Sequence, residues 1–106
     1  MGYIWARNIK EALGVLENFL TEPTLLEDFV EELEVKMDLE FRVKELIDKL
    51  KEFDKKHNSI YWEDIIAGYL ITCNWANLYI DALVITGESR PKILTVNIED
   101  WLEEHK

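Results

Sequence analysis

Cysteine, proline and glycine are scarce in this chain. Its 106 residues include one cysteine, Cys73, two prolines and four glycines. A single thiol cannot form an internal disulfide, so a disulfide-stapled secreted scaffold is excluded and a reducing, cytoplasmic compartment is expected. The four glycines are scattered and form no GxGxxG or GxxxxGK loop, so the motifs of the nucleotide-binding classes are missing.

Residue types that commonly carry catalysis or bind metals are few as well. The two histidines, His57 and His105, lie far apart in the chain, and no HxxxH, CxxC or DxDxDG spacing occurs. Neither serine, Ser59 or Ser89, lies in a GxSxG motif. A Cys73–His57 dyad is conceivable, but a thiol inside an apolar segment is inert. We therefore predict no catalytic residue, no metal site and no cofactor.

Positive charge is in short supply. The chain contains 12 basic and 22 acidic residues, and its net charge is −10. Proteins that bind nucleic acid directly carry a basic stripe, so direct nucleic-acid binding is not expected. Acids at 27, 28, 31, 32 and 34 are interpreted as a solvated helix face and not as a cation site. Mimicry of nucleic acid by such acids is a weak third idea.

A long uninterrupted apolar run is also lacking. The nearest candidate covers residues 65–85, and Asn74, Asn77 and Asp81 interrupt it. An aspartate near the middle of a membrane span costs about 2.5–3.5 kcal/mol on insertion scales. We therefore expect a buried segment of a soluble protein and no membrane association.

Apolar and aromatic residues are plentiful. The hydrophobic fraction is 48%, and tryptophan, tyrosine and phenylalanine occur four times each, which suffices for one domain over residues 1–106. A domain of this size buries only about 60–70% of its unfolded surface, so a homodimer is expected. Glutamine is absent while glutamate and lysine are abundant, a composition typical of a heat-adapted source.

The first half of the chain predicts two helices followed by a strand. Residues 3–20 show helical periodicity, and Thr24 with Glu27 forms a capping-box pattern that opens a second helix. The stretch LEVKMDLEFRV, residues 33–43, then alternates apolar and charged residues without interruption. On a helix its apolar residues would point all round the axis, whereas on a strand they share one face. We therefore predict a half-buried strand, with one long helix over residues 24–57 as the alternative.

The second half alternates helix and strand signals. Residues 44–57 have helical periodicity, and a helix is expected from residue 59 or 60 to 73, continuing to 85 or giving way to a strand at LYIDALVIT. KILTVNI is rich in β-branched residues and predicts a strand, and IEDWLEEHK predicts a short closing helix. The expected fold class is α+β, with helices packed on one face of a short antiparallel sheet; an all-α bundle is the alternative.

Three places could form a binding site. On a continuing helix, Asn74, Asn77 and Asp81 would form a narrow polar stripe that could bind a small ligand or line an enzyme site. Tyr3, Trp5 and Ile4 could form an exposed aromatic patch for a protein partner, or instead fasten the first helix to the core.

The C-terminal segment is the third place. Residues 95–102 place Ile98, Trp101 and Leu102 in a spacing that resembles the peptide by which replication and repair proteins dock on the sliding clamp. The usual glutamine is replaced by Thr95, and a second aromatic residue is replaced by Leu102. The resemblance implies a partner contact through Ile98, Trp101 and Leu102. We expect instead that these side chains pack into the core of the chain itself.

The function favoured by the sequence is a non-enzymatic interaction or regulatory module that pairs with itself or with another protein. A small-ligand or enzymatic domain built on Asn74, Asn77 and Asp81 is the alternative. A clamp-docking accessory protein is a weaker alternative.

Overall fold

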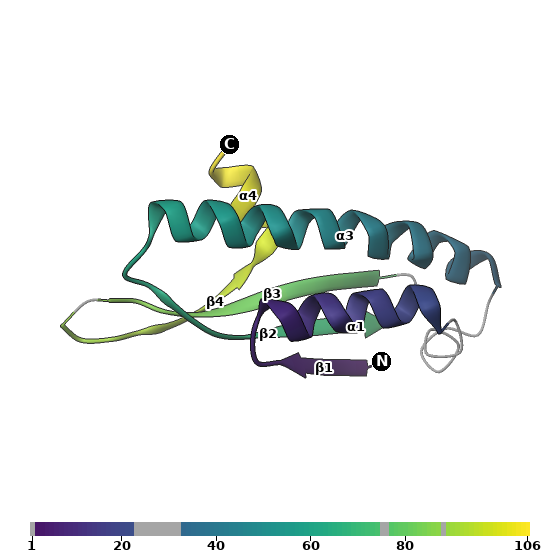
Figure 1. The fold of residues 1–106 in the computed structure, drawn as a ribbon, viewed down its shortest axis with the longest axis horizontal. Coiled ribbons are helices and arrows are strands. Elements are labelled where there is room, and N and C mark those ends of the chain that lie inside the picture. Colours follow the sequence, from purple (N-terminus) through teal and green to yellow (C-terminus); the bar gives the residue numbers. More distant parts are fainter. Residues whose placement is uncertain (1, 23–32, 75–76, 88) are drawn as a thin grey trace.

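A computed structural model gives the fold and describes residues 2–22, 33–74, 77–87 and 89–106. The elements of these residues are β1 (Gly2–Ala6), α1 (Ile9–Thr21), α3 (Leu33–Ile60), β2 (Ile65–Asn74), β3 (Asn77–Ile85), β4 (Ile93–Asn97) and α4 (Ile98–Glu104). The strands form one antiparallel sheet in the order β1-β2-β3-β4. Helices α1 and α3 lie side by side in opposite directions (Figure 1). The predicted α+β class is confirmed, and the all-α alternative is wrong.

The first predicted helix is in fact a strand followed by a helix. Asn8 separates them, because its side chain accepts a hydrogen bond from the Glu11 backbone N–H at 2.9 Å. The Glu11 carboxylate in turn accepts from the Arg7 backbone N–H at 2.7 Å. The bond to Asn8 satisfies an N–H group that the first turn of a helix leaves unpaired, and the bond from Arg7 joins Glu11 to the residue before the cap, so α1 begins after Asn8 and β1 is free to join the sheet.

The alternating stretch 33–43 lies in helix α3, so the predicted strand is wrong. Where side chains are described, the buried positions of α3 follow a spacing of three or four residues, at Val43, Leu46, Leu50, Phe53 and His57. Phe41 is 73% exposed and lies on the other side of the helix. The predicted capping box at Thr24 and Glu27, and the acids at 27–32, lie outside the described residues.

The predicted helix over residues 59–73 is also wrong, because most of it forms strand β2. The alternative, a strand at LYIDALVIT, is confirmed by β3. The register pairs Asn74 with Asn77, so β2 and β3 form a hairpin, and a bulge lies between Ile66 and Gly68. The predicted strand KILTVNI and closing helix IEDWLEEHK are confirmed by β4 and α4.

The core lies between the helices and one face of the sheet. Alternate residues of β3, namely Leu78, Ile80, Ala82 and Val84, are buried and pack in one cluster with the inner faces of α1, α3 and α4. In the part of the chain that the structure describes, no helix has the length and apolar character needed to cross a bilayer.

Candidate functional site

The sheet has a second face that none of the described helices covers; we call it the open face. Side chains on a strand alternate between the two faces, so the residues between the core positions point to the open face. From β1 to β4 it is formed by Tyr3, Trp5, Ile65, Gly68, Leu70, Thr72, Asn77, Tyr79, Asp81, Leu83, Ile85, Ile93, Thr95 and Asn97.

Large apolar side chains dominate this face. Tyr3 is 60% exposed and Trp5 48%, and at the other end of the face Ile65 and Ile93 are 63% and 68% exposed. The sequence hypothesis of an exposed aromatic patch at Tyr3 and Trp5 agrees with these exposures. An apolar surface of this extent on a small protein usually marks an interaction site.

Trp5 lies on the strand beside it because Gly68 leaves room. A Cβ atom at Gly68 would lie 2.2 Å from Cζ2 of the Trp5 ring and 2.9 Å from the Ala6 carbonyl oxygen. Glycine in a strand interior often permits such a close approach. The absence of a side chain at Gly68 therefore leaves the space that the Trp5 indole occupies on the sheet surface.

Among the described residues of the open face, Asp81 is the one aspartate, glutamate, lysine or arginine. It pairs across the sheet with Leu70 on one side and Asn97 on the other. Partial burial raises the pKa of the Asp81 carboxyl, while a hydrogen bond with the Asn97 side chain lowers it. Burial has the larger effect because desolvation disfavours the charged form.

The predicted polar stripe is not formed, because the segment is a hairpin and not a helix. Asn74 and Asn77 are cross-strand partners at the end of the β2–β3 hairpin. Asn77 and Asp81 share the open face, but four residues of extended strand put them about 13 Å apart.

Ile98, Trp101 and Leu102 are buried in the core cluster, as expected for core packing. Asn97 begins α4 by accepting hydrogen bonds from the Glu99 and Asp100 backbone N–H groups, both at 3.1 Å. The alignment of Trp101 and Leu102 with the core thus follows from a short, capped helix that starts where β4 ends.

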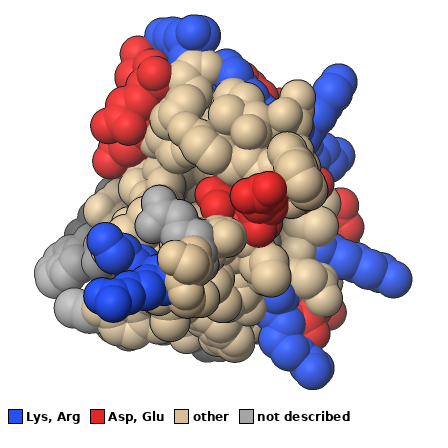
Figure 2. Space-filling model, turned by 90° about the vertical axis from the view of Figure 1, so that its left-hand side faces the viewer, with Lys and Arg blue, Asp and Glu red and all other residues tan. Residues whose placement is uncertain are grey.

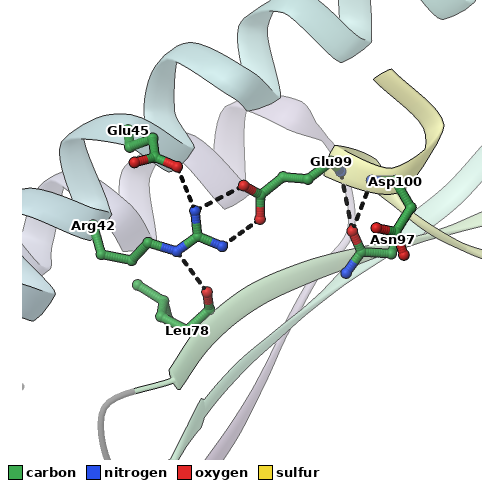
Figure 3. Close-up of polar contacts among 6 residues, drawn as sticks. All are labelled: Arg42, Glu45, Leu78, Asn97, Glu99 and Asp100. Atoms are coloured by element: carbon green, nitrogen blue, oxygen red, sulfur yellow. Dashed lines mark hydrogen bonds and ion pairs between the residues drawn. The ribbon is translucent and has the colours of Figure 1, made fainter. Parts of the chain in front are cut away.

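Arg42 fastens α4 to the rest of the protein (Figure 3). Its guanidinium donates to both carboxylate oxygens of Glu99, the Nη1 contact being 2.7 Å long, and its Nε donates to the Leu78 carbonyl oxygen at 3.1 Å. Glu45 accepts a further bond from Nη1 at 2.7 Å. One side chain therefore joins α3, β3 and α4.

A cleft of about 400 Å³ lies at the end of the molecule where α3 ends and β3 leads into β4; we call it the His57 cleft. Its lining comes from α3 and the following turn, from β3 and β4, and from α4: His57, Tyr61, Glu63, Asp64, Val84, Thr86, Gly87, Leu94, Val96 and Trp101. No sequence pattern predicts this site, because its residues come from four separate segments.

His57 is buried at 2% exposure, with Nε2 3.7 Å from the Asp64 carboxylate and with no hydrogen-bond partner at Nδ1. Burial lowers the pKa of His57, and this outweighs the opposite effect of the nearby Asp64 carboxylate. The conceivable dyad with Cys73 is not formed, because Cys73 lies nine residues beyond Asp64 on β2, about 30 Å away along an extended strand. Burial also raises the pKa of the Cys73 thiol, which makes it a poor nucleophile.

Comparison with known proteins identifies no relative. No family model, curated protein or solved structure matches the chain. Among the described residues, no group of three or more His, Cys, Asp or Glu side chains is placed to hold a metal ion.

Proposed function

We propose that this protein is a non-enzymatic interaction module that forms a homodimer by packing the open faces of two copies against each other. The observation that supports this most is the exposed apolar sheet face with Tyr3 and Trp5 at one end and Ile65 and Ile93 at the other. Two sheets packed face to face bury such residues in a layer about 10 Å thick.

The size of the open face suits a dimer. Four strands spaced by about 4.8 Å span about 19 Å, and strands averaging seven residues extend about 24 Å. The projected area is therefore roughly 450–500 Å². The solvent-accessible area of the face is larger than this, because its side chains make the surface uneven. Standard interfaces bury about 800 Å² on each partner. Pairing of this face with another copy therefore gives an interface at the small end of the range for specific complexes.

The distribution of charge favours a second copy as the partner. The whole chain carries a net charge of −10, so two copies repel each other through most of their surface. Among the residues of the open face that the structure describes, Asp81 alone is an Asp, Glu, Lys or Arg, and approach through this face minimises the repulsion. A twofold axis makes the same apolar patch complementary to itself.

Charge reversal on the open face tests the proposal. The double variant Ile65→Lys/Ile93→Lys places two buried cations in the interface, and we expect the dimer mass measured by light scattering to fall to the monomer mass. Both residues are largely exposed in one copy, so the thermal melt should still show a folded protein. Phe41→Lys is the matched control, because Phe41 is as exposed but lies on α3.

A wild-type protein that is monomeric at tens of micromolar contradicts the proposal. A dimer that survives the double variant but dissociates in Phe41→Lys contradicts it equally, since the helical side would then form the contact.

Docking on a sliding clamp receives no support from the burial of Ile98, Trp101 and Leu102, because a docking peptide needs these side chains exposed. A reducing compartment such as the cytoplasm remains our proposal, supported by the free and buried thiol of Cys73. The origin from a heat-adapted organism likewise remains a proposal that rests on composition.

A further inference from the structure

The His57 cleft lies apart from the open face, on the helical side of the sheet. Its walls include Val84, Leu94 and Val96 from the inner face of β3 and β4, and Trp101 from α4. Figure 2 looks at this end of the molecule: acidic side chains lie near its middle among uncharged residues, and lysine and arginine side chains project around its edge. The volume of about 400 Å³ is that of a small-molecule site.

Three aromatic rings meet at this cleft. The ring centroids of His57 and Tyr61 are 5.4 Å apart, those of His57 and Trp101 are 5.6 Å apart, and those of Tyr61 and Trp101 are 6.3 Å apart. Tyr61 is held in place by a contact of its hydroxyl with His105 Nε2 at 3.3 Å. Phe53 stacks on the His57 ring and His105 on the Trp101 ring, so the rings are fixed, and Tyr61, at 39% exposure, is the ring most open to a ligand.

The charge of the cleft is negative. Glu63 and Asp64 line it, and none of the lysine or arginine residues that the structure describes does. Asp64 accepts a hydrogen bond from the Gly87 backbone N–H at 3.2 Å, which orients the carboxylate without neutralising it. A charged His57 could neutralise it, but protonation would leave a buried N–H at Nδ1 without a partner.

We propose that the His57 cleft binds a small organic cation, an alkylammonium or quaternary ammonium group, against the aromatic residues that line it, of which Tyr61 is the most exposed, and beside its two carboxylates. Aromatic faces attract such cations through the ring quadrupole, most strongly where water is excluded. Apolar walls suit the methyl or methylene groups of the ligand, and Asp64 and Glu63 supply the opposite charge. This inference does not rest on the proposed dimer.

A metal ion fits the cleft less well than an organic cation. Ca²⁺ takes six to eight oxygen ligands and Mg²⁺ needs an octahedral set, whereas the cleft offers two carboxylates beside aromatic rings. An anion is disfavoured by the same carboxylates.

Choline and its neutral carbon isostere, 3,3-dimethylbutan-1-ol, distinguish charge recognition from simple hydrophobic binding. We expect choline to bind saturably in the millimolar range, with NMR shifts centred on the Trp101 indole and the His57 ring, and the alcohol to bind about tenfold more weakly. Glu63→Gln and Asp64→Asn should each weaken choline binding several-fold at constant ionic strength. Glu52→Gln, an exposed change on α3, should leave it unchanged.

Equal binding of the alcohol and choline overturns the proposal, and so does the absence of saturable shifts at the cleft. Equal loss of binding in Glu52→Gln overturns it too, because that result would mean only a general response to net charge. Glu63 is exposed, so Glu63→Gln decides the question even where Asp64→Asn disturbs the fold.

Discussion

At the scale of single residues, two glycines lie in opposite surroundings. Gly14 has no atom within 4 Å of an added Cβ, whereas Gly68 has the Trp5 ring at 2.2 Å. Gly14→Ala should raise the free energy of unfolding by about 0.5–1 kcal/mol, because alanine costs less entropy in a helix. Gly68→Ala should lower it by about 1–3 kcal/mol, because the ring must move. Urea denaturation of both variants measures the difference.

Displacement of the Trp5 indole provides a second readout for Gly68→Ala. The fluorescence or NMR signal of Trp5 should change in Gly68→Ala and stay as in the wild type in Gly14→Ala. Equal stabilities of the two variants would show that Trp5 does not lie over Gly68.

Burial of His57 makes the stability dependent on pH. Its pKa in the folded protein lies below the usual value because burial disfavours the cation, with Asp64 and Asp54 opposing this and His105 adding to it. Protons then bind preferentially to the unfolded chain, so this contribution to stability is complete above about pH 6.5 and declines as the pH falls below that value. Thermal melts between about pH 7 and pH 5 should show this loss of stability. The loss should exceed the part that protonation of carboxylates causes over the same range.

His57→Phe should reduce that pH dependence, since phenylalanine keeps the stacking with Phe53 and removes the titrating group. His105→Gln leaves His57 in place and should keep most of the dependence. An identical pH profile in wild type and His57→Phe would contradict this account of His57.

At the scale of elements, the Arg42–Glu99 pair is the principal polar link between α3 and α4. Arg42→Met should lower the free energy of unfolding by about 1–3 kcal/mol, because it leaves the partly buried Glu99 carboxylate and the Leu78 carbonyl without their donor. Glu45→Gln should cost less than about 0.5 kcal/mol, because Glu45 is more exposed. A double-mutant cycle of Arg42→Met with Glu99→Gln measures the coupling, and additive effects would exclude the link.

The alternation of apolar and charged residues over 33–43 wrongly predicted a strand, and helix α3 shows why. A strand would bury six apolar side chains on one face, but burial of all six is not required: on the helix Phe41 is exposed, while Val43 is buried. Leucine, glutamate, lysine, methionine and arginine all favour helix, and their summed propensities agree with the continuous helix observed.

Strand β2 was missed for the opposite reason. Its residues are apolar on both faces, since Tyr69, Ile71 and Cys73 point to the core while Leu70 lies on the open face. Such a run has no alternation, and periodicity alone does not separate it from a buried helix. The β-branched residues of the segment were the signal that favoured a strand.

For Tyr3 and Trp5 the sequence left two alternatives open, an exposed patch or packing against the first helix, and their exposures of 60% and 48% favour the patch. The His57 cleft was not foreseen. Its residues Tyr61, Asp64, Gly87 and Trp101 meet only after the sheet has formed, and no local pattern contains their distances.

At the scale of the whole molecule, Asp81 controls the proposed dimer. The pKa of its carboxyl is raised by burial in one copy, and a second copy would bury it further. The dimer then binds protons more readily than the monomer, so association should strengthen as the pH falls through this raised pKa. Asp81→Asn should tighten the dimer at pH 7 by removing the charge, as measured by sedimentation equilibrium. Weaker association of Asp81→Asn at pH 7 would contradict this role.

The central claim, pairing through the open face, is tested most directly by isotope-filtered NMR on a mixture of labelled and unlabelled protein. Such an experiment detects only contacts between two copies. We expect intermolecular contacts from open-face side chains such as Trp5, Leu70, Leu83 and Ile93, and none from Phe41 on α3. Intermolecular contacts confined to the helices, or none at a concentration where the protein is dimeric by mass, would contradict the account.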